Sequence, residues 1–204
     1  RQAGYVRTAL GQLDGALERT PARRQLTRLA EAVLHAVAQL TLDDPDRVTV
    51  IGYGNLGAGE LHYSSDLDLV FLHPDGDPPR RGIQRLINAL QLPLPGGKLY
   101  EVDTRLRPNG NAGLLVSSFD HFAHYQQNDA WTWEHQALIR ARVVTGGTEA
   151  VDAFEAIRRR VLCLPRDSAA TRDALAEMRE RQRHQRDETA IRRILGNLQF
   201  AAEL

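Results

Sequence analysis

The chain has 204 residues, enough for one large domain or two small ones with a substantial buried core. Its 26 basic and 26 acidic side chains cancel, so no global field favours nucleic acid or an anionic membrane, and partners must be inferred from local sites. One cysteine, no long apolar run and no signal-peptide pattern predict a cytoplasmic chain in which Cys163 is a buried structural thiol. The abrupt ends of the sequence suggest a piece of a longer protein.

The N-terminal zone, residues 1–46, is expected to be helical. After Pro21, apolar residues recur at steps of three and four from Leu26 to Leu40, which is typical of an amphipathic helix. The sequence TLDDPDR at residues 41–47 then breaks the pattern.

The middle zone, residues 47–116, has strand and turn character. We expect strands in RVTVIGYG (47–54), DLDLVFLH (66–73) and KLYEVDTRLR (98–107), with a helix in RRGIQRLINALQL (80–92). From residue 117 to 204 the pattern returns to helix, in SSFDHFAHYQQ, AWTWEHQALIRARVV, GTEAVDAFEAIRRRVLCL and a long charged segment from Ser168. Strands embedded among helices predict an α/β or α+β fold.

The second expected strand opens with two acids. Because side chains alternate along a strand, Asp66 and Asp68 point to one side, roughly 6 to 7 Å apart, while Leu67, Leu69 and Phe71 take the other. At an effective dielectric constant of about 20, two such carboxylates repel by about 2.5 kcal/mol. A bound cation would reverse the sign of that energy, so the pair is a candidate metal site.

The first expected strand ends in the glycine-rich turn GYGNLGAGEL. Glycine lets the backbone approach a ligand closely, and exposed amides at such a turn attract phosphate. Three interpretations stay open: a plain tight turn, a dinucleotide fingerprint, and a phosphate-approach loop of a nucleotidyltransferase. The gap before the next strand is too short for the full helix of a dinucleotide fold.

A third acid lies in LYEVDTRLRP. If that strand runs through, Glu101, Asp103, Arg105 and Arg107 share one face. Beside Asp66 and Asp68, Asp103 would complete a cradle for two Mg²⁺ ions, which supports in-line attack on phosphorus. The alternative is a surface strand with compensating charges.

These motifs resemble the nucleotidyltransferase superfamily that includes DNA polymerase beta. The stretches IGYGNLGAGELHYSSDLDLVFLH, LYEVDTRLRPNGNAGLLVSSFDHFAHYQ and AWTWEHQALIRARVVTG are similar to the glutamine synthetase adenylyltransferases, and resemble their adenylylating half more than their deadenylylating half. The resemblance is dense from Val48 to Val144. It implies a polymerase beta-like core with a small mixed sheet and flanking helices, and transfer of AMP from ATP to a tyrosine hydroxyl of glutamine synthetase, with release of pyrophosphate.

The resemblance also implies residue roles. Asp66 and Asp68 would be metal ligands, with Asp103 as a third ligand or as the base for the tyrosine hydroxyl. The implied nucleotide and phosphate contacts are Gly54, Asn55, Ser65, Arg105 and Arg107. The implied cofactor is a pair of Mg²⁺ ions and the partners are glutamine synthetase and, through the full-length chain, the PII signal protein; no nucleic acid and no membrane are implied.

Two departures from the family pattern leave alternatives open. Asn55 stands where the family usually has lysine, and Asn197 and Gln199 stand where it has Asp and Glu under a tentative alignment. The rival functions are removal of AMP from the modified tyrosine by phosphate, and a catalytically silent domain that binds nucleotide or glutamine synthetase.

Other conspicuous side chains have structural interpretations. We expect Trp131 and Trp133 to pack in the core, and His135 to be a hydrogen-bonded helix residue. His121 and His124 are a weak candidate metal pair.

Overall fold

The computed structural model describes residues 1–74, 76–95, 97–169, 171–178 and 180. The chain divides into two compact units: Arg1–Ala130 with Glu134–Cys163, and Trp131–Trp133 with the residues from Leu164 onward. The sheet lies in the first unit. Across the described part of the chain, no helix combines the length and the apolar character needed to cross a lipid bilayer.

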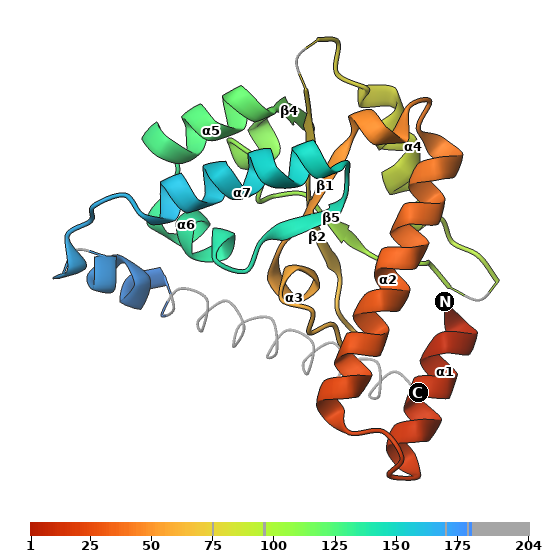
Figure 1. Ribbon diagram of the computed structural model, residues 1–204. Helices are drawn as coiled ribbons and strands as arrows, with labels where there is room; N and C mark the ends of the chain where they lie inside the picture. Colours follow the sequence, from red (N-terminus) through yellow and green to blue (C-terminus); the bar gives the residue numbers. More distant parts are fainter. Residues whose placement is uncertain (75, 96, 170, 179, 181–204) are drawn as a thin grey trace, which may run out of the picture. The chain divides into compact units, whose positions relative to one another are not determined.

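Helices and strands alternate along the first unit after a helical N-terminus (Figure 1). The helices are α1 Gln2–Leu13, α2 Arg19–Thr41, α3 Gly54–Gly57, α4 Arg80–Gln91, α5 Phe119–Asn128, α6 Thr132–Leu138 and α7 Thr148–Leu162, with 3₁₀ turns at Pro45–Arg47 and Gly110–Ala112. The strands are β1 Thr49–Gly52, β2 Leu67–His73, β3 Val102–Asp103, β4 Val116–Ser118 and β5 Arg142–Thr145.

Within the described residues these strands form one five-stranded mixed sheet with β2 near its centre. Strand β1 pairs antiparallel with both β2 and β5. The opposite edge of β2 is shared by two short parallel strands, β3 at its start and β4 at its end. The residues between β3 and β4 therefore leave the sheet and return to the same edge. This confirms the predicted mixed α/β class with a small mixed sheet.

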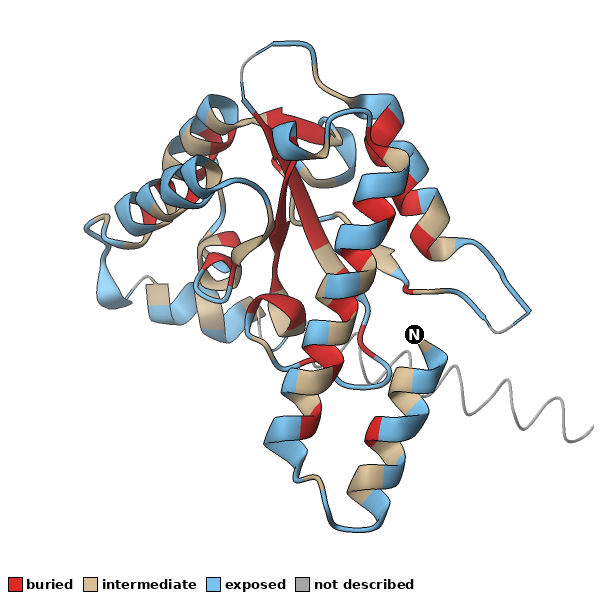
Figure 2. Cartoon of the chain, turned by 45° about the vertical axis from the view of Figure 1, so that its right-hand side comes forward, coloured by how far each residue is buried: buried red, intermediate tan, exposed pale blue. Residues whose placement is uncertain are grey.

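Helices cover both faces of this sheet, which explains why β2 is apolar on both sides (Figures 1 and 2). Leu67, Leu69 and Phe71 belong to the core cluster under α2 and α4. Val70 and Leu72 belong to the cluster under α5 and α7. The alternation predicted from the sequence is confirmed, and it places Asp68 in the same row as Val70 and Leu72, on the α5–α7 side of the sheet.

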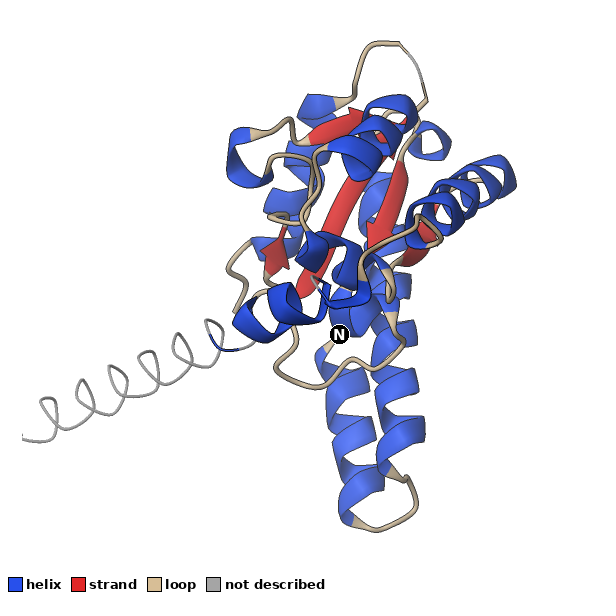
Figure 3. Ribbon diagram, turned by 90° about the vertical axis from the view of Figure 1, so that its left-hand side faces the viewer, coloured by secondary structure: helices blue, strands red, loops and turns tan. Residues whose placement is uncertain are grey.

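The predicted helices at the N-terminus and between the strands are also confirmed. Helix α2 buries residues at three- and four-residue steps, including Leu26, Ala30 and Leu34, and packs against α4 and α1. Figure 3 shows α1 and α2 side by side as an antiparallel pair. The buried residues of α4, Ile83, Leu86 and Leu90, follow the same rule.

The prediction of an uninterrupted helix through AWTWEHQALIRARVV was wrong. Helix α6 ends at Leu138, and Arg142–Thr145 form strand β5 instead. The β-branched pair Val143 and Val144 suits a strand, and β5 supplies the backbone partners that the outer edge of β1 requires. Helix α5 begins only at Phe119, because Ser117 and Ser118 belong to β4. The Ser118 hydroxyl then caps α5 by accepting a hydrogen bond from the His121 amide.

The predicted burial of three side chains was wrong. Cys163 is exposed, because it caps α7 beyond the helix face that buries Phe154, Ile157 and Val161. Trp131 is 70% and Trp133 38% exposed. In α6 the buried positions are Glu134 and Leu138.

In the second unit, residues 168–169 and 171–178 are helical, as predicted for the charged C-terminal segment. The Asp167 carboxylate accepts a hydrogen bond from the Ala169 amide at 2.7 Å, at the start of this helix. Asn197 and Gln199 lie outside the described residues.

Candidate functional site

Three carboxylates converge at the start of β2. Asp68 is the second residue of that strand, and Asp103 is the residue that pairs with it on β3 in the parallel register. Asp66 immediately precedes β2. One carboxylate oxygen from each of the three lies within 4.8 Å of the others, and the described residues contain no other such group of His, Cys, Asp or Glu. The sheet register therefore brings together the three acids singled out from the sequence.

The three acids experience different surroundings. Asp66 is exposed, whereas Asp68 and Asp103 are half-buried. Burial, and then the negative charges of Asp66 and Asp103, raise the pKa of Asp68 to about 6, against the opposing effect of Arg105. Hydrogen bonds from Arg105 hold the pKa of Asp103 below its usual range. The protein thus disfavours the ionised form of Asp68 and favours that of Asp103.

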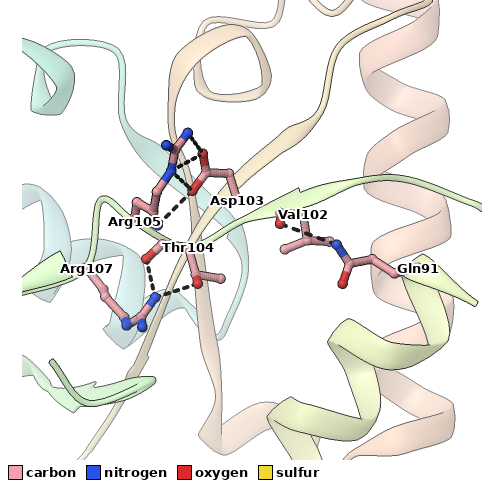
Figure 4. Close-up of polar contacts among 6 residues, drawn as sticks. All are labelled: Gln91, Val102, Asp103, Thr104, Arg105 and Arg107. Atoms are coloured by element: carbon pink, nitrogen blue, oxygen red, sulfur yellow. Dashed lines mark hydrogen bonds and ion pairs between the residues drawn. The ribbon is translucent and has the colours of Figure 1, made fainter. Parts of the chain in front are cut away.

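Arg105 neutralises Asp103 directly (Figure 4). Its Nε donates to both carboxylate oxygens at 3.0 and 2.8 Å, its Nη2 donates to Oδ2 at 2.5 Å, and its backbone amide donates to Oδ1 at 2.8 Å. The Arg105 side chain is 73% exposed, against 18% for Asp103. An exposed guanidinium thus lies at the solvent side of the acidic cluster.

The predicted common face of Glu101, Asp103, Arg105 and Arg107 was wrong, because β3 ends at Asp103. The bond from the Arg105 amide to Asp103 turns the chain there. Val102 consequently packs on the α2–α4 side and Leu106 on the α5–α7 side.

Glu101 and Arg107, the first and last residues of the predicted face, form hydrogen bonds with other residues. Glu101 accepts from Lys98 at 2.7 Å. Arg107 donates to the carbonyl and the hydroxyl of Thr104 (Figure 4). It also donates to the carbonyls of Asn111 and Gly113. Arg107 therefore holds the loop between β3 and β4, and its positive charge also helps to lower the pKa of Asp103.

The glycine-rich turn lies directly against Asp68. Gly54 has φ of +54°, and a Cβ at this position would overlap Oδ2 of Asp68. The Tyr53 amide donates to the Asp68 carbonyl at 2.9 Å. Only glycine accommodates both this backbone conformation and this approach. The turn and the carboxylate cluster are one structural unit.

Asn55 and Ser65 lie together at the edge of this unit. The Asn55 amide nitrogen is 3.3 Å from the Ser65 hydroxyl and 3.3 Å from Nε2 of His62. The Ser65 hydroxyl also accepts from the His62 amide at 3.1 Å, which fixes the loop that leads into Asp66. Next to it a cavity of about 430 Å³ is lined in part by Tyr63, Ser65 and Asp66. The acidic cluster therefore has space for a ligand on its Asp66 side.

The donor set fits a divalent cation. Carboxylate oxygens are ligands that Mg²⁺ takes, and oxygens on opposite sides of such an ion lie roughly 4.2 Å apart. One oxygen from each of the three acids lies within 4.8 Å of the others, which is compatible with that spacing. The mutual repulsion that raises the pKa of Asp68 is the repulsion that a cation would relieve. His121 and His124, by contrast, belong to no such group among the described residues.

Two residues near the glycine turn, Arg142 and Glu31, could not be found from the sequence motifs. Arg142 of β5 donates to the carbonyls of Leu56 and Gly57 and pairs with Glu31 of α2. Both residues lie in segments that the sequence predicted to be helical, so neither was placed near the turn. Only the pairing of β5 with β1 brings Arg142 there.

Comparisons with known proteins place the chain in a family. Residues 1–157 match the family model described as glutamate-ammonia ligase adenylyltransferase. A bifunctional glutamine synthetase adenylyltransferase/adenylyl-removing enzyme of Nitrosococcus oceani is 43% identical over 91% of this chain, which spans 22% of that relative's length. A solved toxin–antitoxin structure with AMP-PNP is 14% identical, covers 78% of this chain and 97% of its own, and has a TM-score of 0.34, too low to indicate a relationship.

The family match and the identity to the Nitrosococcus oceani relative agree with the motifs around the acidic cluster: the chain belongs to the glutamate-ammonia ligase adenylyltransferase family.

Proposed function

We propose that the site transfers AMP from ATP to a tyrosine hydroxyl of glutamine synthetase and releases pyrophosphate. The observation that carries the proposal is the convergence of Asp66, Asp68 and Asp103 beside a glycine turn that contacts Asp68. The family match and the name of the relative support the choice of substrates. We infer a cytoplasmic reaction, with the PII signal protein as a regulator acting through the full-length chain.

In this proposal the three carboxylates hold two Mg²⁺ ions. When bound, such ions neutralise phosphate oxygens and lower the pKa of the attacking hydroxyl. The fit rests on the all-carboxylate donor set and on the separation of its oxygens. Asp68, which is half-buried and subject to the negative charges of the other two acids, would be one of the ligands.

The protein's own groups orient the substrates around these ligands. Gly54 lets the backbone of the turn approach the triphosphate, with Asn55 and Ser65 as neutral donors beside it. Arg105, already at the solvent side of Asp103, binds outer phosphate oxygens, and Arg107 supports it by holding the loop. Asn55 supplies no cation, so we expect weaker binding of ATP than with the lysine usual in the family.

The bond changes are those of an in-line displacement. The tyrosine oxygen forms a bond to the α-phosphorus of ATP, while the bond from that phosphorus to the bridging oxygen breaks and its electron pair leaves with pyrophosphate. We assign Asp103 as the base that accepts the proton of the tyrosine hydroxyl; its carboxylate is ionised at neutral pH, and Arg105 favours that ionised form.

The test is incubation of the protein with glutamine synthetase, Mg²⁺ and ATP labelled at the α-phosphate. We expect label on a tyrosine of the synthetase, lost in Asp66→Asn and retained in Asp43→Asn, a matched control whose side chain is 97% exposed and bound to Arg85.

The rival functions give other products. Phosphate-dependent release of ADP from adenylylated synthetase, with no labelling of the unmodified protein, would establish the removing reaction instead. Binding of ATP or of the synthetase without either product would establish a silent regulatory domain.

A further inference from the structure

The carbonyl end of the glycine turn is held by one side chain from a distant strand. Nε of Arg142 donates to the Gly57 carbonyl at 2.9 Å, and its Nη2 donates to the Leu56 carbonyl at 3.1 Å. Leu56 and Gly57 are buried. The Leu56 carbonyl also accepts from the Gly59 amide at 3.1 Å, whereas for the Gly57 carbonyl the Arg142 guanidinium is the described donor. One guanidinium thus supplies donors to two backbone groups of α3.

Arg142 is itself oriented by an ion pair with Glu31 on helix α2. Its Nη2 also pairs with the Glu31 carboxylate on α2. The two side chains are 36% and 29% exposed, so they lie partly inside the protein. Because Glu31 is fixed on a long helix that packs against the sheet, the guanidinium has a defined position relative to β1 and β2.

Gly57 packs closely against β1 and against the residues that precede β5. A Cβ at Gly57 would overlap the carbonyl oxygens of Arg140 and Gly52. At the other end of the turn, Gly54 is pressed against Oδ2 of Asp68. The one-turn helix α3 therefore contacts the Asp68 carboxylate at its first residue, Gly54, and the Arg142 guanidinium at its last, Gly57.

We propose that Arg142, aimed by Glu31, is a positioning residue for the nucleotide: it sets how closely the Gly54–Gly57 turn approaches Asp68. This inference rests on the proposed function only in that the nucleotide binds at this turn. Without the guanidinium, the buried Gly57 carbonyl loses its described donor, the Leu56 carbonyl keeps the Gly59 amide alone, and the turn relaxes away from Asp68. The triphosphate then loses its alignment with the carboxylate cluster.

Arg142→Ala tests the inference, with Arg140→Ala as the matched control. Arg140 lies two residues away on the same segment, but its guanidinium binds the exposed Glu60 at 2.6 Å and makes no described contact with the turn. The readouts are the dissociation constant of a fluorescent ATP analogue with Mg²⁺, KM for ATP, KM for glutamine synthetase, and the thermal midpoint.

For Arg142→Ala we expect the dissociation constant of the analogue and KM for ATP to rise together by about tenfold, the change that corresponds to the loss of one charge-assisted hydrogen bond. KM for glutamine synthetase stays unchanged. Arg142→Lys recovers part of the effect, because one ammonium cannot bridge both carbonyls and Glu31. Glu31→Gln shifts KM for ATP in the same direction by a smaller factor.

A merely structural role for Arg142 would lower the thermal midpoint and the active fraction while leaving both ATP constants unchanged, and that result would overturn the inference. So would an equal rise in KM for both substrates. If the wild type binds the analogue but transfers no AMP, the proposed function fails and the binding measurement still decides this inference. If the wild type binds no ATP analogue, both fail.

Discussion

Arg105 contacts both carboxylate oxygens of Asp103, through Nε at 3.0 and 2.8 Å and through Nη2 at 2.5 Å. The guanidinium thereby occupies the oxygens that a cation would use. Since Arg105 is mostly exposed and Asp103 is not, the arginine is the partner that is free to swing toward solvent. Cation binding at the cluster and the ion pair with Arg105 should therefore compete.

Arg105→Ala should separate the two roles of this side chain. Without the competing guanidinium, we expect the protein to bind Mn²⁺, used as a probe for Mg²⁺, a few times more tightly in the absence of nucleotide. KM for ATP should rise, because a phosphate donor is lost. Calorimetric titration with Mn²⁺ and steady-state kinetics measure the two effects.

Arg107→Ala is the comparison for that variant. Arg107 holds Thr104 and the loop that follows, so its loss should lower the thermal midpoint without tightening Mn²⁺. Weaker Mn²⁺ binding in Arg105→Ala would show that the arginine supports the cation site and does not compete with it.

Asp68→Asn should stabilise the metal-free protein and abolish its response to metal. The folded-state pKa of Asp68 is raised to about 6, so its ionised form opposes folding above that pH, and the penalty disappears as pH falls toward 3.8. At pH 8 we expect the variant to be about 1 kcal/mol more stable, a value reduced for solvent screening of a part-exposed group. At pH 4 the difference should vanish.

Denaturant unfolding at both pH values, with and without Mg²⁺, measures this effect. Saturating Mg²⁺ should stabilise the wild type by mass action and leave Asp68→Asn unchanged. Asp43→Asn, at an exposed site, should respond to Mg²⁺ like the wild type. Equal stabilisation of Asp68→Asn and the wild type by Mg²⁺ would contradict the assignment of Asp68 as a ligand.

Metal affinity should fall below pH 6. A cation binds the ionised carboxylate, and Asp68 takes up its proton near pH 6, whereas the pKa of Asp103 is lowered by Arg105. Below that pH we expect the dissociation constant for Mn²⁺ to rise by about tenfold per pH unit, the slope of competition with one proton. Titrations between pH 5 and 8, with circular dichroism to verify folding, measure it. Affinity that is constant down to pH 5 would show that Asp68 is not a ligand or has an ordinary pKa.

Much of this site follows from local pattern. The alternation in LDLVFLH places Leu67 and Leu69 in the core and Asp68 on the other face, because a central strand between two helical layers leaves no other arrangement. The proximity of Asp103 also followed from its expected strand. The end of that strand did not, because it depends on the bond from the Arg105 amide to Asp103, which no periodicity encodes.

Strand β5 could not be predicted from the sequence for a different reason. A short apolar stretch such as ALIRARVV fits a helix or a strand equally well, and the unpaired edge of β1 decides between them. Because Arg142 comes to the glycine turn only through that pairing, its role was not visible in the sequence. Tertiary partners, rather than local propensity, thus determine the least predictable part of the site.

Gly57→Ala should disrupt the glycine turn at its last residue, whereas Asp68 contacts its first residue, Gly54. The added methyl group would overlap the carbonyl oxygens of Arg140 and Gly52, and backbone atoms cannot move aside as a flexible side chain does. We expect a loss of about 2 kcal/mol in unfolding free energy, together with a rise in KM for ATP. Gly147→Ala is the control, because a Cβ there meets no atom within 4 Å, and its effect should stay within about 0.5 kcal/mol. Chemical denaturation measures the unfolding free energy of both variants. Equal stability would mean that Gly57 does not pack closely against the carbonyls of Arg140 and Gly52.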